Sequence, residues 1–250
     1  MTRVIFCGCY GRMGNAVRQI VKDEKDMEIV AGVDIMDGSA EFPVYKTISD
    51  VKEAADVIID FSSPKALASL LEYATSKNVP VVLCTTGFSE EQLAEIKTAS
   101  GKVAILRSAN MSLGINTLVK LLKTATEILS SNGYDIEIVE RHHNQKKDAP
   151  SGTALLLADA INDAADGKYE YVYDRSDRRE VRPQNEIGIS AVRGGSIVGD
   201  HEVIFAGLDE VIEIKHRAYS RSVFAKGAVS AAAFLAGKPA GMYDMSNVIG

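Results

Sequence analysis

Short apolar runs recur through the first 110 residues and alternate with amphipathic stretches of helical length. Continuous apolar runs are typical of parallel strands, because such strands are buried on both faces. Strands that alternate with helices of this length predict a parallel sheet with helices on both faces. The expected strands lie at residues 4–7, 27–34, 55–63, 79–87 and 102–110, and two of the expected helices lie at residues 64–77 and 89–99.

The pattern changes after Asn110, where residues 112–131 predict one long amphipathic helix. Segments of strand character follow, with alternating polarity and short connections, which predicts a largely antiparallel or mixed sheet with one face toward solvent or a partner. A helix that starts near Ser151 is expected on the other face, and an alanine-rich helix is expected at residues 220–237. The chain therefore has a second domain of a different class. Its expected strands lie at residues 134–141, 187–195, 198–207 and 209–218.

Composition narrows the classes of function. Apolar residues make up 46% of the chain and charged residues 25%, which is typical of a soluble globular protein. The net charge of -6 disfavours nucleic acid and anionic membranes as partners, and no apolar run is long enough to cross a bilayer. The three cysteines lack the spacing of a zinc site or a redox pair, which favours reduced thiols. We therefore expect a cytoplasmic protein without nucleic-acid or membrane partners.

A glycine-rich turn follows the first expected strand. Gly8, Gly11 and Gly14 have the spacing G-x-x-G-x-x-G and lead into a helix, whose first N–H groups favour a pyrophosphate. The motif alone is also compatible with a tight strand-to-helix turn that binds nothing. Asp34 ends the next strand, where a carboxylate accepts hydrogen bonds from an adenosine ribose, and this favours a dinucleotide site.

Two further polar segments end the third and fourth expected strands. Ser62 follows one strand, and Thr85 and Thr86 follow the other. Ligands of open parallel sheets bind along this edge, although composition alone favours plain turn residues or helix caps.

Two of the four histidines, His142 and His143, stand side by side at the end of an expected strand. A metal site would need further ligands such as His201, His216 or Asp148, but no pair has helical ligand spacing. Adjacent strand residues also point to opposite faces, so we expect no metal site. A solvent-exposed histidine pair remains a second interpretation.

The third interpretation is a site for an anionic substrate. Lys146 and Lys147 add positive charge beside the histidines, and residues 151–153 begin a helix whose N–H groups favour a carboxylate. Histidine titrates near neutral pH and can donate a proton there. Together with a hydride-delivering cofactor, these features predict a reductase of a small acidic molecule.

The segment ERHHNQKKDAPSGTA resembles the signature E-x-H-H-x-x-K-x-D-A-P-S-G-T-A of the 4-hydroxy-tetrahydrodipicolinate reductase family, which acts in the diaminopimelate route to lysine. Six further segments resemble family motifs in the same order and extend the likeness over nearly the whole chain. These segments are GCYGRMG, DFSSP, TTGF, SANMSLGIN, RGGSIVGDHEVIFAG and SRSVFAKGA.

The resemblance implies reduction of a small cyclic dicarboxylate, 4-hydroxy-tetrahydrodipicolinate, with NADH and/or NADPH. It implies that His142 is the catalytic acid and Lys146 a second proton donor, and that His143, Ser151, Gly152 and Thr153 bind substrate carboxylates. The implied cofactor contacts are Gly8, Cys9, Tyr10, Gly11, Arg12, Met13, Asp34, Cys84, Thr85, Thr86, Ser108, Ala109, Asn110 and Met111.

The same resemblance implies a Rossmann-like doubly wound α/β domain that is discontinuous, with residues 1–112 and 218–250. Residues 113–217 then form an inserted α+β domain of mixed sheet that binds substrate and assembles a homotetramer. Two positions depart from the family pattern. Cys84 stands where many members have glycine, and Ile35 stands where some have arginine.

Asp34 bears on the choice of cofactor, because its carboxylate would repel the 2′-phosphate of NADPH. Ile35 and Met36 offer no compensating cation, whereas Arg12 or Arg3 could reach the phosphate. We therefore expect NADH to be used at least as well as NADPH. Two rival functions are another two-domain reductase, which would lack the H-H-x-x-K and S-G-T spacing, and a dinucleotide-sensing regulator, which should carry a basic nucleic-acid-binding module.

Overall fold

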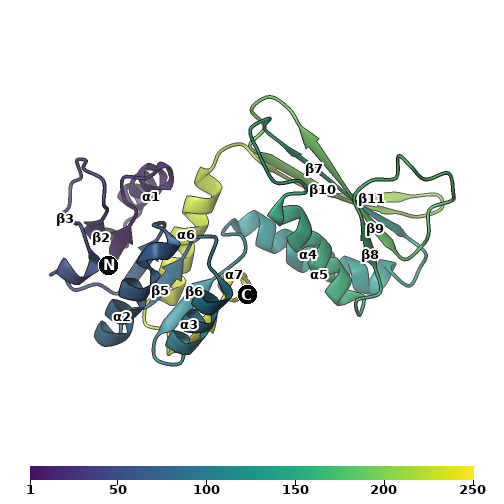
Figure 1. The fold of residues 1–250 in the computed structure, drawn as a ribbon. Coiled ribbons are helices and arrows are strands. Elements are labelled where there is room, and N and C mark those ends of the chain that lie inside the picture. Colours follow the sequence, from purple (N-terminus) through teal and green to yellow (C-terminus); the bar gives the residue numbers. More distant parts are fainter. The chain divides into compact units, whose positions relative to one another are not determined.

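The computed structural model describes residues 1–250, and the chain divides into two compact units (Figure 1). The first unit comprises Met1–Leu113 and Arg221–Gly250, and the second comprises Gly114–Ser220. No helix in either unit is both long enough and apolar enough to cross a membrane.

The first unit contains a seven-stranded sheet in the order β12-β6-β5-β4-β1-β2-β3, and every neighbouring pair is parallel. The order of β3 to β6 around β1 is that of a doubly wound nucleotide-binding sheet, with β1 and β4 at the point where the winding reverses. This confirms the predicted fold class of the domain. The strands are β1 (Thr2–Cys7), β2 (Met27–Val33), β3 (Val44–Tyr45), β4 (Val57–Asp60), β5 (Val81–Leu83), β6 (Ala104–Arg107) and β12 (Gly241–Tyr243).

Helices cover both faces of this sheet, as Figure 1 shows. On one face, α1 (Arg12–Asp23), α6 (Ser222–Leu235) and α7 (Met245–Ile249) enclose a core that includes Val17 and Ala228. On the other face, α2 (Leu67–Lys77) and α3 (Glu90–Ser100) contribute Leu70 and Ile96 to a second core. Because α6 comes from the last part of the chain, the domain is discontinuous, as predicted. The short 3₁₀ turns η1 (Ile48–Asp50) and η2 (Pro64–Ala66) complete the unit.

Helix α6 lies very close to the segment that follows β6. A Cβ added at Gly227 would stand 1.7 Å from the carbonyl oxygen of Met111, so only glycine permits this approach. The last part of the chain thereby packs against the end of the sheet where the polar loops gather.

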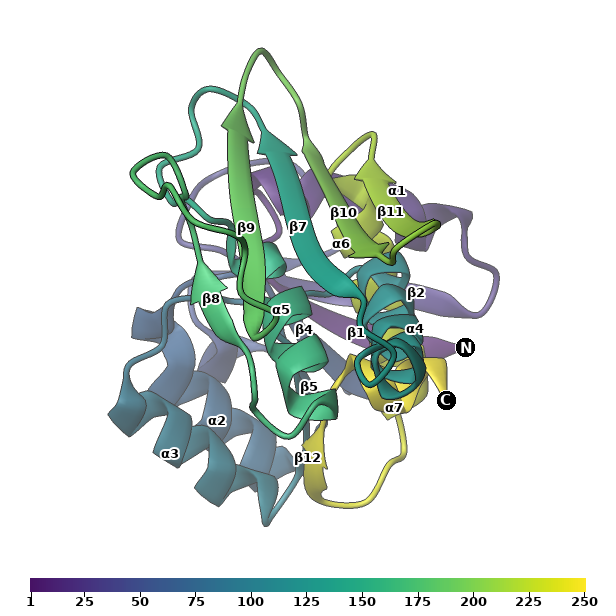
Figure 2. The same ribbon diagram turned by 90° about the vertical axis from the view of Figure 1, so that its right-hand side faces the viewer.

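The second unit is a five-stranded mixed sheet in the order β11-β10-β7-β9-β8 (Figure 2). Strand β10 is antiparallel to both β7 and β11, whereas β9 is parallel to β7 and β8. Helices α4 (Leu113–Leu129) and α5 (Gly152–Ala164) bury one face with a core that includes Leu122, Ile161 and Phe205. This matches the predicted mixed sheet with helices on one side. The strands are β7 (Asp135–His142), β8 (Glu170–Val172), β9 (Glu186–Arg193), β10 (Gly199–Ala206) and β11 (Val211–Ala218).

Candidate functional site

The loop after β1 needs glycine at two positions. Gly8 has a φ of +82°, and a Cβ there would stand 2.6 Å from the carbonyl oxygen of Phe61. At Gly14, a Cβ would stand 2.3 Å from the carbonyl oxygen of Cys9, so helix α1 packs directly against the loop. Gly11 is the N-cap of α1, so the turn leads directly into the helix start, as predicted for a phosphate-binding loop.

A cavity of about 570 Å³ opens beside this loop. Asp34 lies in its wall, and its carboxylate accepts hydrogen bonds from the backbone N–H groups of Tyr10, at 2.8 Å, and Met36, at 2.9 Å. A carboxylate has about four acceptor positions, so capacity remains for ribose hydroxyls. Five predicted cofactor residues line this cavity, namely Gly8, Tyr10, Gly11, Arg12 and Asp34.

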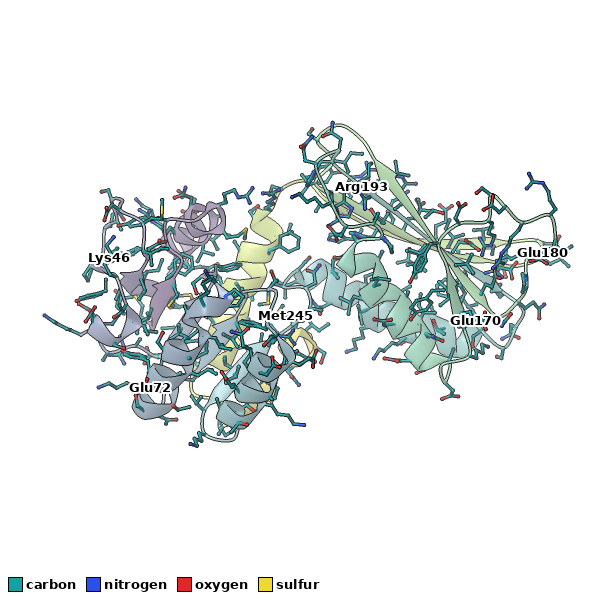
Figure 3. All side chains as sticks on the ribbon, in the orientation of Figure 1. Lys46, Glu72, Glu170, Glu180, Arg193 and Met245 are labelled. Atoms are coloured by element: carbon teal, nitrogen blue, oxygen red, sulfur yellow. The ribbon has the colours of Figure 1, made fainter.

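One cation in the wall of this cavity was missed by the sequence reasoning. The Nζ of Lys46 lies 2.6 Å from the carboxylate of Asp37 and 3.0 Å from the carbonyl oxygen of Ile35 (Figure 3). Arg3, which the sequence offered as a phosphate ligand, instead forms a 2.7 Å ion pair with Asp56. Arg3 lies at the start of β1, away from the glycine loop that follows the end of that strand. Lys46 replaces it as a candidate.

A second cavity, of about 500 Å³, shares Phe61, Ser62 and Ser63 with the first. Asp60 lies beneath these shared residues and accepts hydrogen bonds from the N–H and hydroxyl groups of Ser62, at 3.2 and 2.5 Å. Burial raises the pKa of the Asp60 carboxyl group. Eight predicted cofactor residues line this cavity, namely Met13, Cys84, Thr85, Thr86, Ser108, Ala109, Asn110 and Met111.

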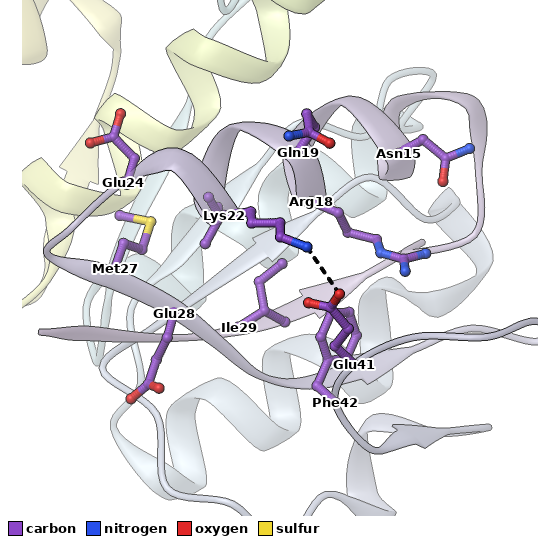
Figure 4. Close-up of a pocket in the computed structure, with 11 residues that line it drawn as sticks. Asn15, Arg18, Gln19, Lys22, Glu24, Met27, Glu28, Ile29, Glu41 and Phe42 are labelled. Atoms are coloured by element: carbon purple, nitrogen blue, oxygen red, sulfur yellow. Dashed lines mark hydrogen bonds and ion pairs between the residues drawn. The ribbon is translucent and has the colours of Figure 1, made fainter.

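The remaining predicted cofactor residue, Cys9, lines neither cavity, because its side chain is fully buried in the core. A further hollow of about 520 Å³ lies beside α1 and contains the ion pair between Lys22 and Glu41, at 3.1 Å (Figure 4). It includes none of the predicted site residues.

In the second unit, the buried face of β7 changes from apolar to polar along the strand. Ile136 and Ile138 pack in the core, and Glu140 and His142 follow on the same face because strand side chains alternate. The Nδ1 atom of His142 lies 2.7 Å from the Glu140 carboxylate, which is completely buried. The polar end of this face is the candidate substrate site.

The Glu140 carboxylate receives hydrogen bonds from three residues. Besides His142, these are the backbone N–H of Ser151, at 2.9 Å, and both Nη atoms of Arg193, each at 2.7 Å. Burial alone would raise the pKa of Glu140, but the hydrogen bonds from His142, Arg193 and Ser151 lower it to about 2. The carboxylate is therefore ionised and accepts hydrogen bonds only.

His201 on β10 stands opposite Glu140 in the sheet. Its Nε2 lies 3.0 Å from the hydroxyl oxygen of Ser151, and its ring meets that of His142 edge-on at 5.2 Å. Burial, followed by the charge of His142, lowers the pKa of His201 to about 3, so this imidazole is neutral. The Ser151 hydroxyl oxygen also accepts the N–H of Ala154, at 3.1 Å, and so caps helix α5.

The loop between β7 and α5 carries the remaining predicted residues. Lys146 pairs with Asp148 at 2.9 Å, and a guanidinium nitrogen of Arg193 holds the carbonyl oxygen of Asp148 at 2.7 Å. A Cβ at Gly152 would meet nothing within 4 Å, so space is open at the first turn of α5. His143 directly follows β7 and Thr153 is the second residue of α5, and both are partly buried. No cluster of three or more histidine, cysteine or acidic side chains is arranged to hold a metal ion.

Sequence reasoning missed Glu140, Arg193 and the role of His201 as a partner of Ser151. Glu140 carried a detectable signal, because it precedes His142 by two residues and therefore shares its face of the strand. Arg193 and His201 lie in the segment RGGSIVGDHEVIFAG, which resembles a family motif, but the sequence alone did not place them beside His142, since β9 and β10 meet β7 only through long-range pairing.

Both parts of the chain match the models of one protein family. Residues 2–111 match the family part described as "Dihydrodipicolinate reductase, N-terminus", and residues 114–249 match "Dihydrodipicolinate reductase, C-terminus". A 4-hydroxy-tetrahydrodipicolinate reductase of Caldanaerobacter subterraneus subsp. tengcongensis is 53% identical over 100% of this chain and 98% of its own length. One of Clostridium tetani is 54% identical over 98% of this chain and 96% of its own length.

A solved structure supports the same likeness. The dipicolinate-bound dihydrodipicolinate reductase from Paenisporosarcina sp. TG-14 is 25% identical, with a TM-score of 0.81 over 98% of this chain and 97% of that one. A probable dehydrogenase from Thermotoga maritima, 13% identical with a TM-score of 0.61 over 99% and 92% of the two chains, shares the fold.

Proposed function

This chain belongs to the dihydrodipicolinate reductase family, and on that premise we propose how its residues divide the work of the reaction. The activity is the NAD(P)H-dependent reduction of 4-hydroxy-tetrahydrodipicolinate to tetrahydrodipicolinate, in the diaminopimelate route to lysine. The first unit is the nucleotide-binding domain, and we assign substrate binding to the second unit, Gly114–Ser220.

His142 is the proton donor. The observation that carries this assignment is its anchored ring, whose Nδ1 is held at 2.7 Å by Glu140 at the polar end of the sheet. Loss of the substrate hydroxyl group as water gives a conjugated ring, to which a bound nicotinamide would supply hydride. Negative charge would then develop on a ring carbon or nitrogen, and a proton from His142, assisted by Lys146, would neutralise it.

The two substrate carboxylates bind on either side of the β7–α5 loop. One lies at the first turn of α5, where Gly152 and Thr153 present N–H and hydroxyl groups and the helix dipole favours negative charge. The N–H and hydroxyl groups of the buried Ser151 are instead bonded to Glu140, His201 and Ala154, so Ser151 shapes this helix start from beneath. The other carboxylate lies near the imidazole of His143 and the ammonium group of Lys146. The structure of the Paenisporosarcina relative was solved with dipicolinate, which is a planar dicarboxylate. We propose that this chain binds dipicolinate at the start of α5.

The dinucleotide occupies the two adjoining cavities of the first unit. The adenosine half fits the cavity that contains Asp34, and the nicotinamide half fits the cavity lined by Thr85 and Asn110. The start of α1 at Gly11 supports this fit, because the first N–H groups of that helix would face a phosphate. Asp34 favours NADH, and Lys46 offsets part of its repulsion toward NADPH. We therefore propose that NADH is used at least as well as NADPH.

The second unit also carries the proposed assembly surface. Val192, Val211 and Ile212 leave apolar side chains exposed on β9 and β11, which supports a homotetramer formed through this sheet. We propose that this tetramer works in the cytoplasm. Light scattering of the purified protein tests the assembly, and a monomeric mass would contradict it.

A single substitution tests the proposed acid. His142→Gln keeps a polar side chain of similar size, so kcat should fall by about 10²–10⁴-fold, the usual contribution of a positioned general acid. The dissociation constant of NADH, measured by fluorescence, should stay unchanged. His216→Gln, which alters a histidine on β11 of the same sheet, is the matched control and should keep wild-type turnover. Wild-type turnover of His142→Gln would contradict the assignment.

A further inference from the structure

Glu140 is a fully buried carboxylate that takes no direct part in the proposed proton transfer. Four hydrogen bonds converge on it, from Nδ1 of His142, the N–H of Ser151 and both Nη atoms of Arg193. Burying a charge is costly unless it is paired and hydrogen-bonded, and these four hydrogen bonds offset the desolvation free energy of the carboxylate. A carboxylate in this position links the proposed acid to the proposed carboxylate-binding helix start.

The contacts of His142 leave one ring nitrogen for chemistry. Glu140 accepts hydrogen bonds only, so Nδ1 must carry the hydrogen that lies between them. The edge-on ring of His201, at 5.2 Å, packs against the same imidazole and limits its rotation. Any proton that His142 gives to a substrate must therefore leave from Nε2 of the doubly protonated ring, and the neutral Nδ1–H form remains afterwards.

The chain keeps the Nε2 side clear. Gly199 lies across from His142 at the start of β10, and a Cβ there would stand 3.0 Å from Nε2. A contact of that length is tighter than side chains ordinarily make, so glycine leaves room at the nitrogen that has no carboxylate partner. Geometry therefore distinguishes the two nitrogens, with one anchored and one accessible.

Arg193 fixes the carboxylate itself. Its guanidinium binds both Glu140 oxygens at 2.7 Å and also holds the carbonyl oxygen of Asp148 (Figure 3 labels Arg193 at the end of β9). A bidentate pair of this kind sets orientation as well as charge. The anchor of His142 is thus tied to strand β9 and to the β7–α5 loop.

We propose that Glu140, held by Arg193, is the positioning residue that fixes the Nδ1–H tautomer of His142 and directs its Nε2 toward the substrate. This inference rests on the proposed role of His142 as the acid. Glu140 contacts neither substrate nor cofactor in this arrangement, and its effect on proton transfer passes through the histidine, while its bond to the Ser151 N–H helps to fix the start of α5.

A double-mutant cycle tests the proposal. Glu140→Gln should lower kcat by about 10–100-fold, by analogy with the range found for hydrogen-bond partners that orient metal-bound histidines. The KM for substrate should change less than kcat, and the dissociation constant of NADH should not change. In a His142→Gln background, Glu140→Gln should cause no further fall, because the residue it positions is gone. If the two losses multiply, Glu140 has only a structural role and the proposal is overturned.

Glu202→Gln is the matched control. Glu202 is also a buried carboxylate of this sheet, paired with Arg141 at 2.8 Å and Lys215 at 2.7 Å, but it does not contact His142. Its replacement should leave kcat within twofold of the wild type. An equal fall in both variants would assign the effect to loss of a buried ion pair.

The wild-type protein provides a measurement that needs no Glu140 variant to fold. With ¹⁵N-labelled histidine, the His142 resonances are identified by their disappearance in His142→Gln, and neutral His142 should show a protonated Nδ1 and a bare Nε2. The opposite tautomer would overturn the proposal. If His142→Gln itself keeps full turnover, the proposed acid is wrong. If His142→Gln is inactive while Glu140→Gln is fully active, the acid stands and the positioning role fails.

Discussion

Replacing His201 by glutamine should flatten the dependence of stability on pH. His201 is buried, and burial, followed by the charge of His142, lowers its pKa from 6.5 to about 3. The unfolded chain therefore binds more protons than the folded chain between these values. The contribution of the buried His201 to the free energy of unfolding is therefore complete above about pH 6.5 and is lost progressively as the pH falls toward about 3.

The magnitude follows from the size of this shift. At about 1.4 kcal/mol per pKa unit, a histidine that titrates near 6.5 when unfolded and near 3 when folded costs about 2 kcal/mol of unfolding free energy at pH 5. Glu140 acts in the same direction, because its pKa is lowered from 4.5 to about 2, so its contribution is lost only below about pH 4.5. At pH 5 it costs only about 0.2 kcal/mol, so the histidine dominates.

The assay is urea unfolding followed by circular dichroism at pH 8 and pH 5, at one protein concentration because assembly also affects stability. Glutamine cannot titrate in this range but can still hydrogen-bond Ser151. The wild type should therefore lose about 2 kcal/mol more than His201→Gln between the two pH values. Parallel losses in the two proteins would refute the idea that a buried neutral imidazole stands at this position.

Three further predictions concern other parts of the chain. Thr153→Ala should raise the Kd of dipicolinate while leaving that of NADH unchanged, as titration calorimetry would show; unchanged dipicolinate binding would remove Thr153 from the site. Lys46→Gln should weaken NADPH binding more than NADH binding, and Ile35→Arg should favour NADPH, because each changes the positive charge that offsets the repulsion between Asp34 and the 2′-phosphate. Like charges about 4 Å apart repel by roughly 1 kcal/mol in water. Both effects are measured as kcat/KM and Kd for the two cofactors at one ionic strength, and a tenfold wild-type preference for NADPH would mean that cations outweigh Asp34. Gly227→Ala should lower the free energy of unfolding by about 1–3 kcal/mol or more, because its Cβ would overlap the Met111 carbonyl oxygen at 1.7 Å. Urea unfolding identical to that of the wild type would contradict the close approach of α6 to Met111.

The sequence predicted long elements better than short ones. All five expected strands of the first sheet exist, and the expected helix at residues 112–131 is α4, Leu113–Leu129. The elements β3, β8, β12 and α7 were missed, because two to five residues carry too little periodicity to stand out from loops. The expected strand at residues 55–63 ends at Asp60, since the polar residues that follow form the cavity wall.

The site was predictable where chemistry is local in sequence. The glycine loop, Asp34 and the segment from His142 to Thr153 are short motifs, and their residue types indicate anion and nucleotide binding. The partners of these motifs were not predictable, because pairing of β7 with β9 and β10 brings Arg193 and Gly199 to His142 from more than 50 residues away. Lys46 was missed for the same reason, since β3 reaches the cavity only through its pairing with β2.

The central claim is tested most directly by the reaction itself. The purified protein is mixed with NADH and 4-hydroxy-tetrahydrodipicolinate, cofactor absorbance is followed, and the product is identified by mass spectrometry. We predict that one NADH is oxidised for each tetrahydrodipicolinate formed, and that dipicolinate slows the reaction by competing with the substrate. Cofactor oxidation that does not depend on the substrate, or that yields no tetrahydrodipicolinate, would contradict the account.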